Sequence, residues 1–432
     1  MNYEDALTYL DSLNKFGIRL GLDRIKRLLE LMGNPEQKYR TIHVTGTNGK
    51  GSTTAMINAI LGCSGIKAGM YTSPHLVDYT ERIRVNGCEI TQVEFSQAVS
   101  STKQYVDIML AEGAESPTQF EVLTAAAFYY FASIGVEYAV IEVGLGGLLD
   151  STNVIIPEVA VITNVAMDHA DRCGGTLSSV AQHKAGIIKP GIPVITAVAN
   201  EIQPIIEEKA QAMKSPLYIY GKHFFSEDQG VSDYKQIVVF ESENYGKMER
   251  LKVNLLGLHQ VENSALAIMT AMILQAKDLR ITSDSIANGL ADVAWPGRFE
   301  IIEGTPKVII DGAHNPAGAK MLRLNLDNMF TDRSIVFLLG ILQDKDITGI
   351  VESLIKPQDI VVVTSPDSER AAPPEMVSNT ISARWVEVSA SIEEGLNRAY
   401  QLAGDGGIVC VAGSLYLIGF ARRIIYNRQK KV

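Results

Sequence analysis

The chain of 432 residues has few cysteines and a deficit of positive charge. Its four cysteines, Cys63, Cys88, Cys173 and Cys410, form no CxxC pair, so the sequence indicates neither a structural zinc site nor a redox motif. It has 39 lysines and arginines against 49 aspartates and glutamates, which gives a formal net charge of −10. This balance argues against a general binder of nucleic acid or of anionic membranes, because such proteins usually carry a basic patch.

Long apolar runs are also missing from the sequence. No run approaches the roughly 20 apolar residues that a membrane-spanning helix needs. The first ten residues, MNYEDALTYL, are acidic and lack the apolar stretch of a secretory signal. We therefore expect a cytoplasmic protein with unpaired thiols, which binds neither membranes nor nucleic acid.

The rest of the composition is typical of a globular protein, with 46% hydrophobic and 20% charged residues. The length is enough for two or three domains. Apolar, β-branched segments alternate with helical ones, which predicts an α/β fold with a mostly parallel sheet covered by helices. Short alternating segments between Lys214 and Val253 predict a small antiparallel insertion. A second series of strands and helices begins after Pro296, so we predict domains 1–296 and 297–432.

A glycine-rich loop follows the first apolar strand, in the segment TIHVTGTNGKGST. Here Lys50 lies between Gly49 and Gly51. Glycines let backbone N–H groups approach an anion, and a following helix adds its N-terminal donors. The loop is shorter than the usual GxxxxGK[ST] motif, because Val44 stands at the position of the first glycine. We interpret it as a polyphosphate loop, and the alternative is an ordinary turn with an exposed lysine.

Polar side chains follow three further strands: Ser73 and His75, then Glu142, then Asp168 and His169. Because the carboxyl ends of parallel strands meet at one sheet edge, these residues should gather beside the glycine loop. Magnesium prefers oxygen ligands and often keeps phosphate oxygens and waters. Ser73, Glu142 and His169 are therefore candidate ligands for Mg²⁺ bound to ATP, although His169 alone could be a simple loop histidine.

Three other positions are weak signals when each is taken alone. Lys184 could be a lysine on a helix surface. Asp311 follows the strand KVII, where an aspartate often only caps a helix or a turn. Arg298 lies in the segment WPGRFE.

The whole chain resembles the folylpolyglutamate synthase and dihydrofolate synthase family of the Mur ligase superfamily. The resemblance rests on these segments, in order: FGIRLGLDRIKRLLELMGNP, HVTGTNGKGST, YTSPHLVDYTERIRVNG, TQFEVLTAAAFYYF, IEVGLGGLLDSTNV, TNVAMDH, KAGIIKPG, GLHQVENSALA, WPGRFE, IIDGAHNPAG, LGILQDKD and AGSLYLIG. It implies an N-terminal P-loop ATPase domain and a C-terminal Rossmann-like domain. It also implies a monomer that joins L-glutamate to tetrahydrofolate, dihydropteroate or both, through an acyl phosphate, with ATP converted to ADP and phosphate.

The resemblance also implies roles for single residues. Those implied to bind ATP are Thr47, Asn48, Gly49, Lys50, Gly51, Ser52, Asn263, Arg298 and Asp311. Those implied to hold two Mg²⁺ ions are Ser73, Glu142, His169 and Lys184, with Lys184 modified to a carbamate, which turns a cation into an anion. Lys50, Lys184 and His169 would be catalytic, and Thr118, Phe120 and Asp150 would bind the pterin.

The sequence departs from the family pattern at Leu148, His183 and Cys173. The family usually has arginine at the position of Leu148, glutamate at that of His183 and leucine at that of Cys173. Because Leu148 removes a cation, an alternative is an amide ligase of the same superfamily that acts on a non-folate carboxylate. A P-loop switch or a silent ATP-binding protein is a further alternative. A switch would not need Arg298 and Asp311, and the mostly complete set of metal and nucleotide residues argues against a silent protein.

Overall fold

The structure is a computed structural model that describes residues 1–17, 19–167, 174–331 and 333–429. The chain divides into two compact units. The first comprises Met1–Asn254 and Gln260–Val293, and the second comprises Leu255–His259 and Ala294–Val432. These compact units do not test the functional domains predicted as 1–296 and 297–432, which remain a prediction.

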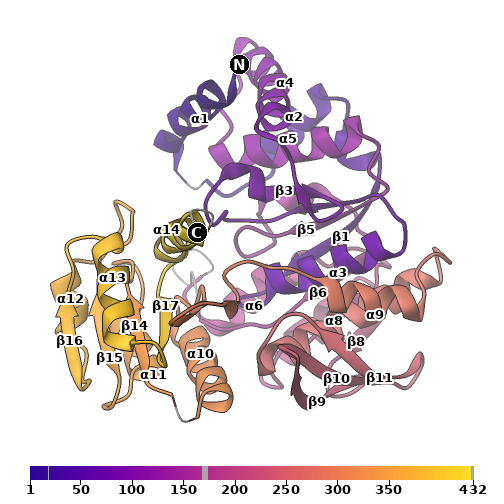
Figure 1. The fold of residues 1–432 in the computed structure, drawn as a ribbon. Helices are drawn as coiled ribbons and strands as arrows, with labels where there is room; N and C mark the ends of the chain where they lie inside the picture. Colours follow the sequence, from indigo (N-terminus) through magenta and orange to yellow (C-terminus); the bar gives the residue numbers. More distant parts are fainter. Residues whose placement is uncertain (18, 168–173, 332, 430–432) are drawn as a thin grey trace. The chain divides into compact units, whose positions relative to one another are not determined.

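An eight-stranded sheet forms the centre of the first unit (Figure 1). Its strands, in spatial order, are β4 (Cys88–Glu89), β3 (Ile83–Val85), β2 (Ala68–Tyr71), β5 (Tyr138–Glu142), β1 (Arg40–Thr45), β6 (Val159–Ile162), β7 (Val194–Thr196) and β8 (Leu217–Ile219). The six strands from β2 to β8 pair in parallel, and β3 and β4 add an antiparallel edge. Every residue of β5 and β6 is buried, as expected for strands covered on both faces. The predicted parallel sheet is confirmed.

Helices cover both faces of this sheet. A large apolar core joins one face to α1 (Tyr3–Ser12), α2 (Asp23–Leu31), α4 (Gln92–Ala111) and α5 (Gln119–Ser133). Figure 1 shows the strands between these helices and a second group, which is α3 (Lys50–Cys63), α8 (Leu258–Gln275) and α9 (Ser283–Asp292). A separate apolar cluster packs α6 (Leu177–Ala185) and α7 (Gln203–Ala212) against β6 and β7. Because helices cover both faces of the sheet, a ligand can reach it only at the ends of the strands.

The antiparallel insertion is confirmed, but it starts later than predicted. It is a three-stranded sheet of β9 (Phe224–Ser232), β10 (Lys235–Ser242) and β11 (Gly246–Val253). The segment from Lys214 to Ile219 was wrongly included, because β8 pairs in parallel with β7 and extends the main sheet. Three residues are too few to show whether a strand is alternating or continuously buried.

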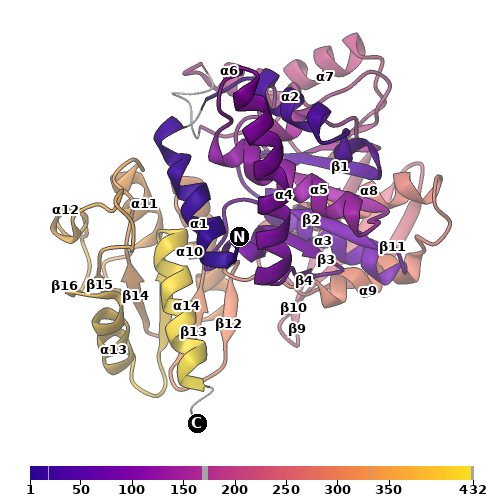
Figure 2. The ribbon, with the colours of Figure 1, turned by 90° about the horizontal axis from the view of Figure 1, so that it is seen from above.

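The second unit contains a six-stranded sheet in the order β12 (Glu300–Ile302), β13 (Lys307–Ile310), β17 (Ile408–Ala412), β14 (Ile335–Leu339), β15 (Ile360–Val363) and β16 (Trp385–Val388). All its pairings are parallel except that of β12 with β13. One face carries α13 (Ile392–Ala403) and α14 (Leu415–Gln429), which lie side by side in Figure 2. The opposite face packs on α10 (Pro316–Met329) and α11 (Ile347–Leu354), with α12 (Pro374–Ser378) at the end near β16.

The predicted second α/β unit is therefore confirmed, although two edge strands were missed. Both β12 and β16 are short and only partly buried, so their sequences give no clear apolar signal. In the described part of the chain, no helix is both long enough and apolar enough to cross a membrane.

Candidate active site

The glycine loop connects β1 to α3 and has the geometry of an anion-binding turn. Gly46 has a φ of 153°, and a Cβ there would lie 1.8 Å from the Thr163 hydroxyl oxygen. Gly49 has a φ of 82° and forms the N-cap of α3. The first turn of a helix leaves its N–H groups without helical acceptors, which makes this end suitable for phosphate.

Lys50 folds back over the loop that precedes it. Its Nζ donates to the carbonyl oxygens of Gly46 and Thr47, both at 3.0 Å. The ammonium group therefore lies against the loop that leads into α3. A cation at this place can offset the charge of a polyphosphate.

The end of β6 fixes the first half of the loop. The N–H of Thr47 donates to the carbonyl oxygen of Asn164 at 3.0 Å, and the N–H of Asn48 donates to Asn164 Oδ1 at 2.9 Å. In return, the hydroxyl of Thr163 donates to the carbonyl oxygen of Asn48 at 2.6 Å. Sequence reasoning did not single out Thr163 and Asn164, although two polar residues directly after a buried strand were a signal for them.

Helix α8 approaches the loop from another part of the chain. A Cβ on Gly49 would come within 2.4 Å of Asn263 Oδ1, so the asparagine lies directly against the loop. The amide of Gln260 donates to the Ser52 hydroxyl at 3.4 Å and accepts from Asn263 Nδ2 at 2.9 Å. The structure thus places Asn263 beside the glycine loop, whose residues were predicted together with it to bind ATP. Gln260 also contacts this loop, and the sequence analysis did not predict it.

Glu142 ends β5 and is almost completely buried, with 5% exposure. Its Oε2 accepts from the backbone N–H of Ser73 at 3.2 Å, which places the ends of β5 and β2 together. His169 lies outside the described residues. Among the residues that are described, no group of three or more His, Cys, Asp or Glu side chains could hold a metal ion. One buried carboxylate beside a serine nevertheless suits Mg²⁺, which takes most of its other ligands from phosphates and waters.

Lys184 is buried in α6, close to the loop that follows β5. A Cβ on Gly147 would lie 2.7 Å from the carbonyl oxygen of His183 and 3.2 Å from Lys184 Cα. The N–H of Leu148 donates to the His183 carbonyl oxygen at 2.7 Å. Asn153 Nδ2 donates to the carbonyl oxygens of Leu148 at 2.9 Å and Gly186 at 3.2 Å. The loop and the lysine helix are thus held together by backbone contacts, which the sequence did not indicate.

The side chains of Phe120 and Asp150 both lie close to Gly144. A Cβ on Gly144 would lie 2.5 Å from the Phe120 ring and 3.2 Å from Asp150 Oδ2. The two predicted pterin residues are therefore adjacent, two positions beyond Glu142. Thr118 instead caps α5, because its hydroxyl accepts from the N–H of Glu121 at 3.3 Å.

The Asp150 carboxylate is held by its own loop. Oδ1 accepts from the N–H of Thr152 at 3.0 Å and from its hydroxyl at 2.5 Å, and Oδ2 accepts from the N–H of Leu145 at 2.8 Å. Burial raises the pKa of this carboxyl group, and these hydrogen bonds oppose the rise. Beneath it, His43 Nε2 lies 2.9 Å from the Thr152 hydroxyl. Burial lowers the pKa of His43 to about 3, so the imidazole is neutral at pH 7.

Arg298 and Asp311 lie together in the second unit. A Cβ on Gly312 would come within 2.2 Å of an Arg298 guanidinium nitrogen. Asp311 accepts from the N–H groups of Phe299 and Ala313, both at 2.8 Å. Burial raises the pKa of Asp311, whereas the charge of Arg298 opposes the rise.

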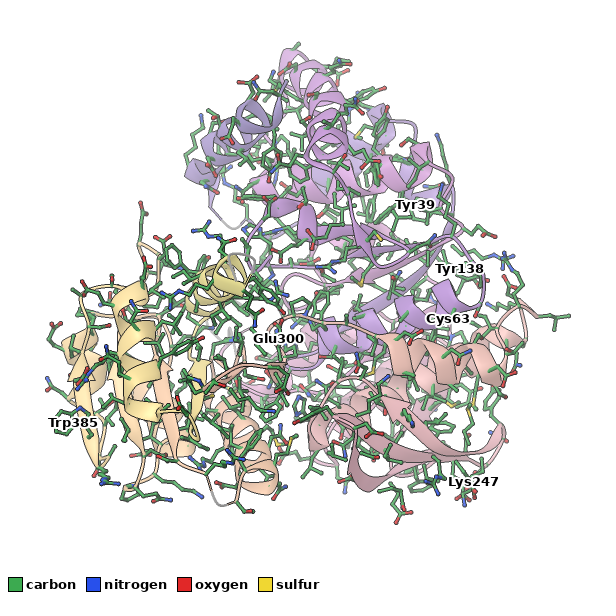
Figure 3. The ribbon with its side chains drawn as sticks, viewed as in Figure 1. Tyr39, Cys63, Tyr138, Lys247, Glu300 and Trp385 are labelled. Carbon is green, nitrogen blue, oxygen red and sulfur yellow. The ribbon has the colours of Figure 1, made fainter. Side chains whose placement is uncertain are left out.

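Glu300, which is labelled in Figure 3, is the first residue of β12, the strand that follows Arg298. It accepts from Arg422 Nε at 2.9 Å and from the Tyr426 hydroxyl at 2.9 Å, and both partners belong to α14. The segment that carries Arg298 is therefore fixed to the last helix of the chain.

In a comparison with known proteins, two family models match the chain. Residues 44–271 match the model of the Mur ligase middle domain, and residues 297–415 match that of the Mur ligase glutamate ligase domain. The chain is 34% identical to the dihydrofolate synthase/folylpolyglutamate synthase of Bacillus subtilis over 426 residues, with 98% of each chain covered. It is 35% identical to the folylpolyglutamate synthase of Lacticaseibacillus casei, with 98% of this chain and 99% of that protein covered.

Solved structures agree with these relatives. The folylpolyglutamate synthase of Mycobacterium tuberculosis complexed with ADP aligns with a TM-score of 0.89 at 30% identity, covering 98% of this chain and 99% of that one. Escherichia coli FolC in complex with DHPP and ADP aligns with a TM-score of 0.88 at 29% identity, covering 99% of both chains. The predicted ligase and the predicted fold are confirmed: the chain belongs to the folylpolyglutamate synthase/dihydrofolate synthase family of the Mur ligases.

Proposed function

We propose that the protein is an ATP-dependent ligase that joins L-glutamate to a folate, and that dihydropteroate is a further candidate acceptor. One observation carries this proposal. The adjacent strands β2, β5, β1 and β6 lead at their carboxyl ends, in that order, to Ser73, Glu142, the phosphate loop and Thr163. A loop for ATP and a buried carboxylate for a metal thus stand side by side at the edge where parallel sheets bind ligands.

The proposed reaction has two steps. First, a carboxylate oxygen of the acceptor attacks the γ-phosphorus of ATP, which forms an acyl phosphate and releases ADP. Second, the amino group of L-glutamate attacks the acyl carbon, the C–O bond to phosphate breaks, and the amine loses a proton as phosphate leaves. Lys50 and the N-terminus of α3 would stabilise the charge on the phosphates during the first step.

Two Mg²⁺ ions are part of this proposal. Ser73, Glu142 and His169 would hold one ion, and a carbamate on Lys184 would help to hold the second. The carbamate forms when the lysine nitrogen bonds to the carbon of CO₂ and loses a proton. Bound Mg²⁺ would offset the negative charge of ATP and of the acceptor carboxylate. The support is the buried carboxylate of Glu142 beside Ser73 and the burial of Lys184 next to the Leu148 loop.

The remaining residues complete the proposed site. Thr47, Asn48, Gly49, Gly51, Ser52 and Asn263 would contact ATP from the domain 1–296, and Arg298 and Asp311 from the domain 297–432. Phe120, Asp150 and Thr118 would bind the pterin. The partners would be small molecules only, and the protein would act as a cytoplasmic monomer.

An assay of ADP release from the full-length protein tests this function. ATP and Mg²⁺ are combined with dihydropteroate or tetrahydrofolate as acceptor and with L-glutamate or other amino acids as donor. We expect release that requires both a folate acceptor and L-glutamate. Release with neither acceptor, but with another carboxylic acid, would replace the folate assignment by the alternative that Leu148 raised.

A further inference from the structure

A compact cluster of Arg82, His75 and Tyr79 lies in the loop and short helix that follow β2. Arg82 Nε donates to His75 Nδ1 at 2.9 Å. The guanidinium carbon lies 5.2 Å from the centre of the Tyr79 ring, and the His75 ring lies 4.2 Å from that centre. A guanidinium held at one nitrogen and stacked on a ring has a fixed direction, and it keeps further N–H donors.

Backbone and ring contacts place this cluster beside both groups of predicted site residues. The N–H of Thr72 donates to the carbonyl oxygen of Arg82 at 3.0 Å, directly before Ser73. The Tyr79 hydroxyl accepts from Gln119 Nε2 at 3.2 Å, directly before Phe120. Arg82 is thus linked to the segment of the proposed metal ligands and to that of the proposed pterin residues.

The same loop leads to two buried carboxylates, those of Glu142 and Asp150. The backbone N–H of Ser73 donates to Glu142 Oε2 at 3.2 Å. Tyr71 stacks on Phe120 with ring centres 6.2 Å apart, and Phe120 lies beside Asp150 at Gly144. Arg82 is thus a cation on a segment whose neighbours carry both carboxylates.

An anionic acceptor has to approach these two carboxylates. Like charges in a partly buried site repel strongly unless a cation accompanies them. Leu148 is uncharged and cannot fill this role. A forked guanidinium, by contrast, binds a carboxylate through two parallel hydrogen bonds.

We propose that Arg82 binds the carboxylate of the acceptor that is to be phosphorylated, and that His75 is the positioning residue that directs it. This inference rests on the proposed function, because it assumes a carboxylate acceptor in the Phe120 and Asp150 region. The alternative is that the cluster only stabilises the loop after β2. In that case its removal would weaken all acceptors equally.

A comparison of two ligands separates the two explanations. Binding of dihydropteroate and of its carboxamide analogue is measured by calorimetry on the full-length protein with a non-hydrolysable ATP analogue and Mg²⁺. We expect the wild type to prefer the carboxylate by about tenfold or more, the range of a charged hydrogen bond. Arg82→Ala should lose this preference and bind the carboxamide as the wild type does.

Further variants complete the test. His75→Leu should reduce the preference, whereas His75→Gln, which keeps an acceptor for Arg82 Nε, should largely retain it. Arg84→Ala is the matched control, because Arg84 pairs with Glu89 at 2.9 Å instead. If Arg82→Ala does not fold, Arg82→Lys replaces it and should lose most of the preference, because it cannot form two parallel hydrogen bonds.

An unchanged preference in a folded Arg82 variant would overturn the inference while leaving the ligase function intact. Failure of the wild-type protein to release ADP with any folate acceptor would instead contradict the proposed function. The two failures are therefore distinct.

Discussion

The backbone of Leu148 fills the space in which a side chain on Gly186 would have to lie. A Cβ on Gly186 would come within 2.5 Å of Leu148 Cα. Gly186 caps α6 with a φ of −61°, so its backbone conformation is open to any residue and only this contact requires glycine. The contact holds the loop between Glu142 and Asp150 against the helix that carries Lys184.

Gly186→Ala should therefore displace this loop. We expect a loss of about 1–3 kcal/mol in the free energy of unfolding, as for other overpacked sites. Ligase activity should fall further than this loss explains, because the loop carries Asp150. Gly62→Ala in α3 is the control, since a Cβ there meets nothing within 4 Å. Urea unfolding and ADP release measured on both variants check this, and equal behaviour of the two would contradict it.

Lys50→Ala should leave the fold intact and lower turnover by roughly 100-fold or more, as for other groups that stabilise transition-state charge. Lys50 Nζ donates to the carbonyl oxygens of Gly46 and Thr47, and the side chain is only half-buried, so its removal should cost little packing. Circular dichroism controls for folding. Near-normal activity in a folded variant would mean that the loop does not bind the triphosphate through this lysine.

Lys184→Ala should abolish activity if Lys184 acts as a carbamate. A small carboxylate such as acetate, or bicarbonate, should restore part of the activity because it can enter the space left by the side chain. Lys184→Arg keeps the charge but cannot form a carbamate, and it should stay inactive. Full activity of Lys184→Arg, or a crystal structure with an unmodified ammonium group grown in the presence of CO₂, would count against the carbamate.

Leu148→Arg tests the departure from the family pattern. Leu148 is 43% exposed, so an arginine side chain can be accommodated. If an anion contact has been lost, activity with dihydropteroate or tetrahydrofolate should rise about tenfold or more, equivalent to ~1.4 kcal/mol. If Arg82 already supplies that contact, activity should stay constant or fall. The rates of the wild type and of Leu148→Arg with the two acceptors decide between these outcomes.

We expect the protein to lose stability on acidification because His43 is buried in its neutral form. Its pKa is lowered by burial to about 3, against 6.5 in the unfolded chain, so the unfolded state binds more protons between these values. Stability should therefore fall as the pH drops below about 6.5, by about 2 kcal/mol between pH 7 and 5 for this group. His43→Gln can still bond to Thr152 and should show a flatter pH dependence in urea unfolding. Identical curves would assign the effect to other groups.

The sequence by itself determined the parallel sheet and the strand ends that carry polar residues. Continuous apolar strands such as those of β5 and β6 can only be buried on both faces, and their polar ends must then meet at one edge. This logic placed Ser73, Glu142 and the loop of Lys50 together, and the structure agrees for these residues. It failed for the short strands β8, β12 and β16, whose three or four residues carry too weak a pattern.

Only the tertiary structure decided which residues support the site from a distance. The contacts of Gly186 with Leu148, of Asn164 with the loop of Lys50, and of Gln119 with the Tyr79 hydroxyl are all made between separate segments. Such contacts leave no periodic trace in the sequence, because each is made by a single residue whose partner is set by how helices and loops pack. Residue types along the chain therefore define which chemistry is available, whereas packing defines which of these groups meet.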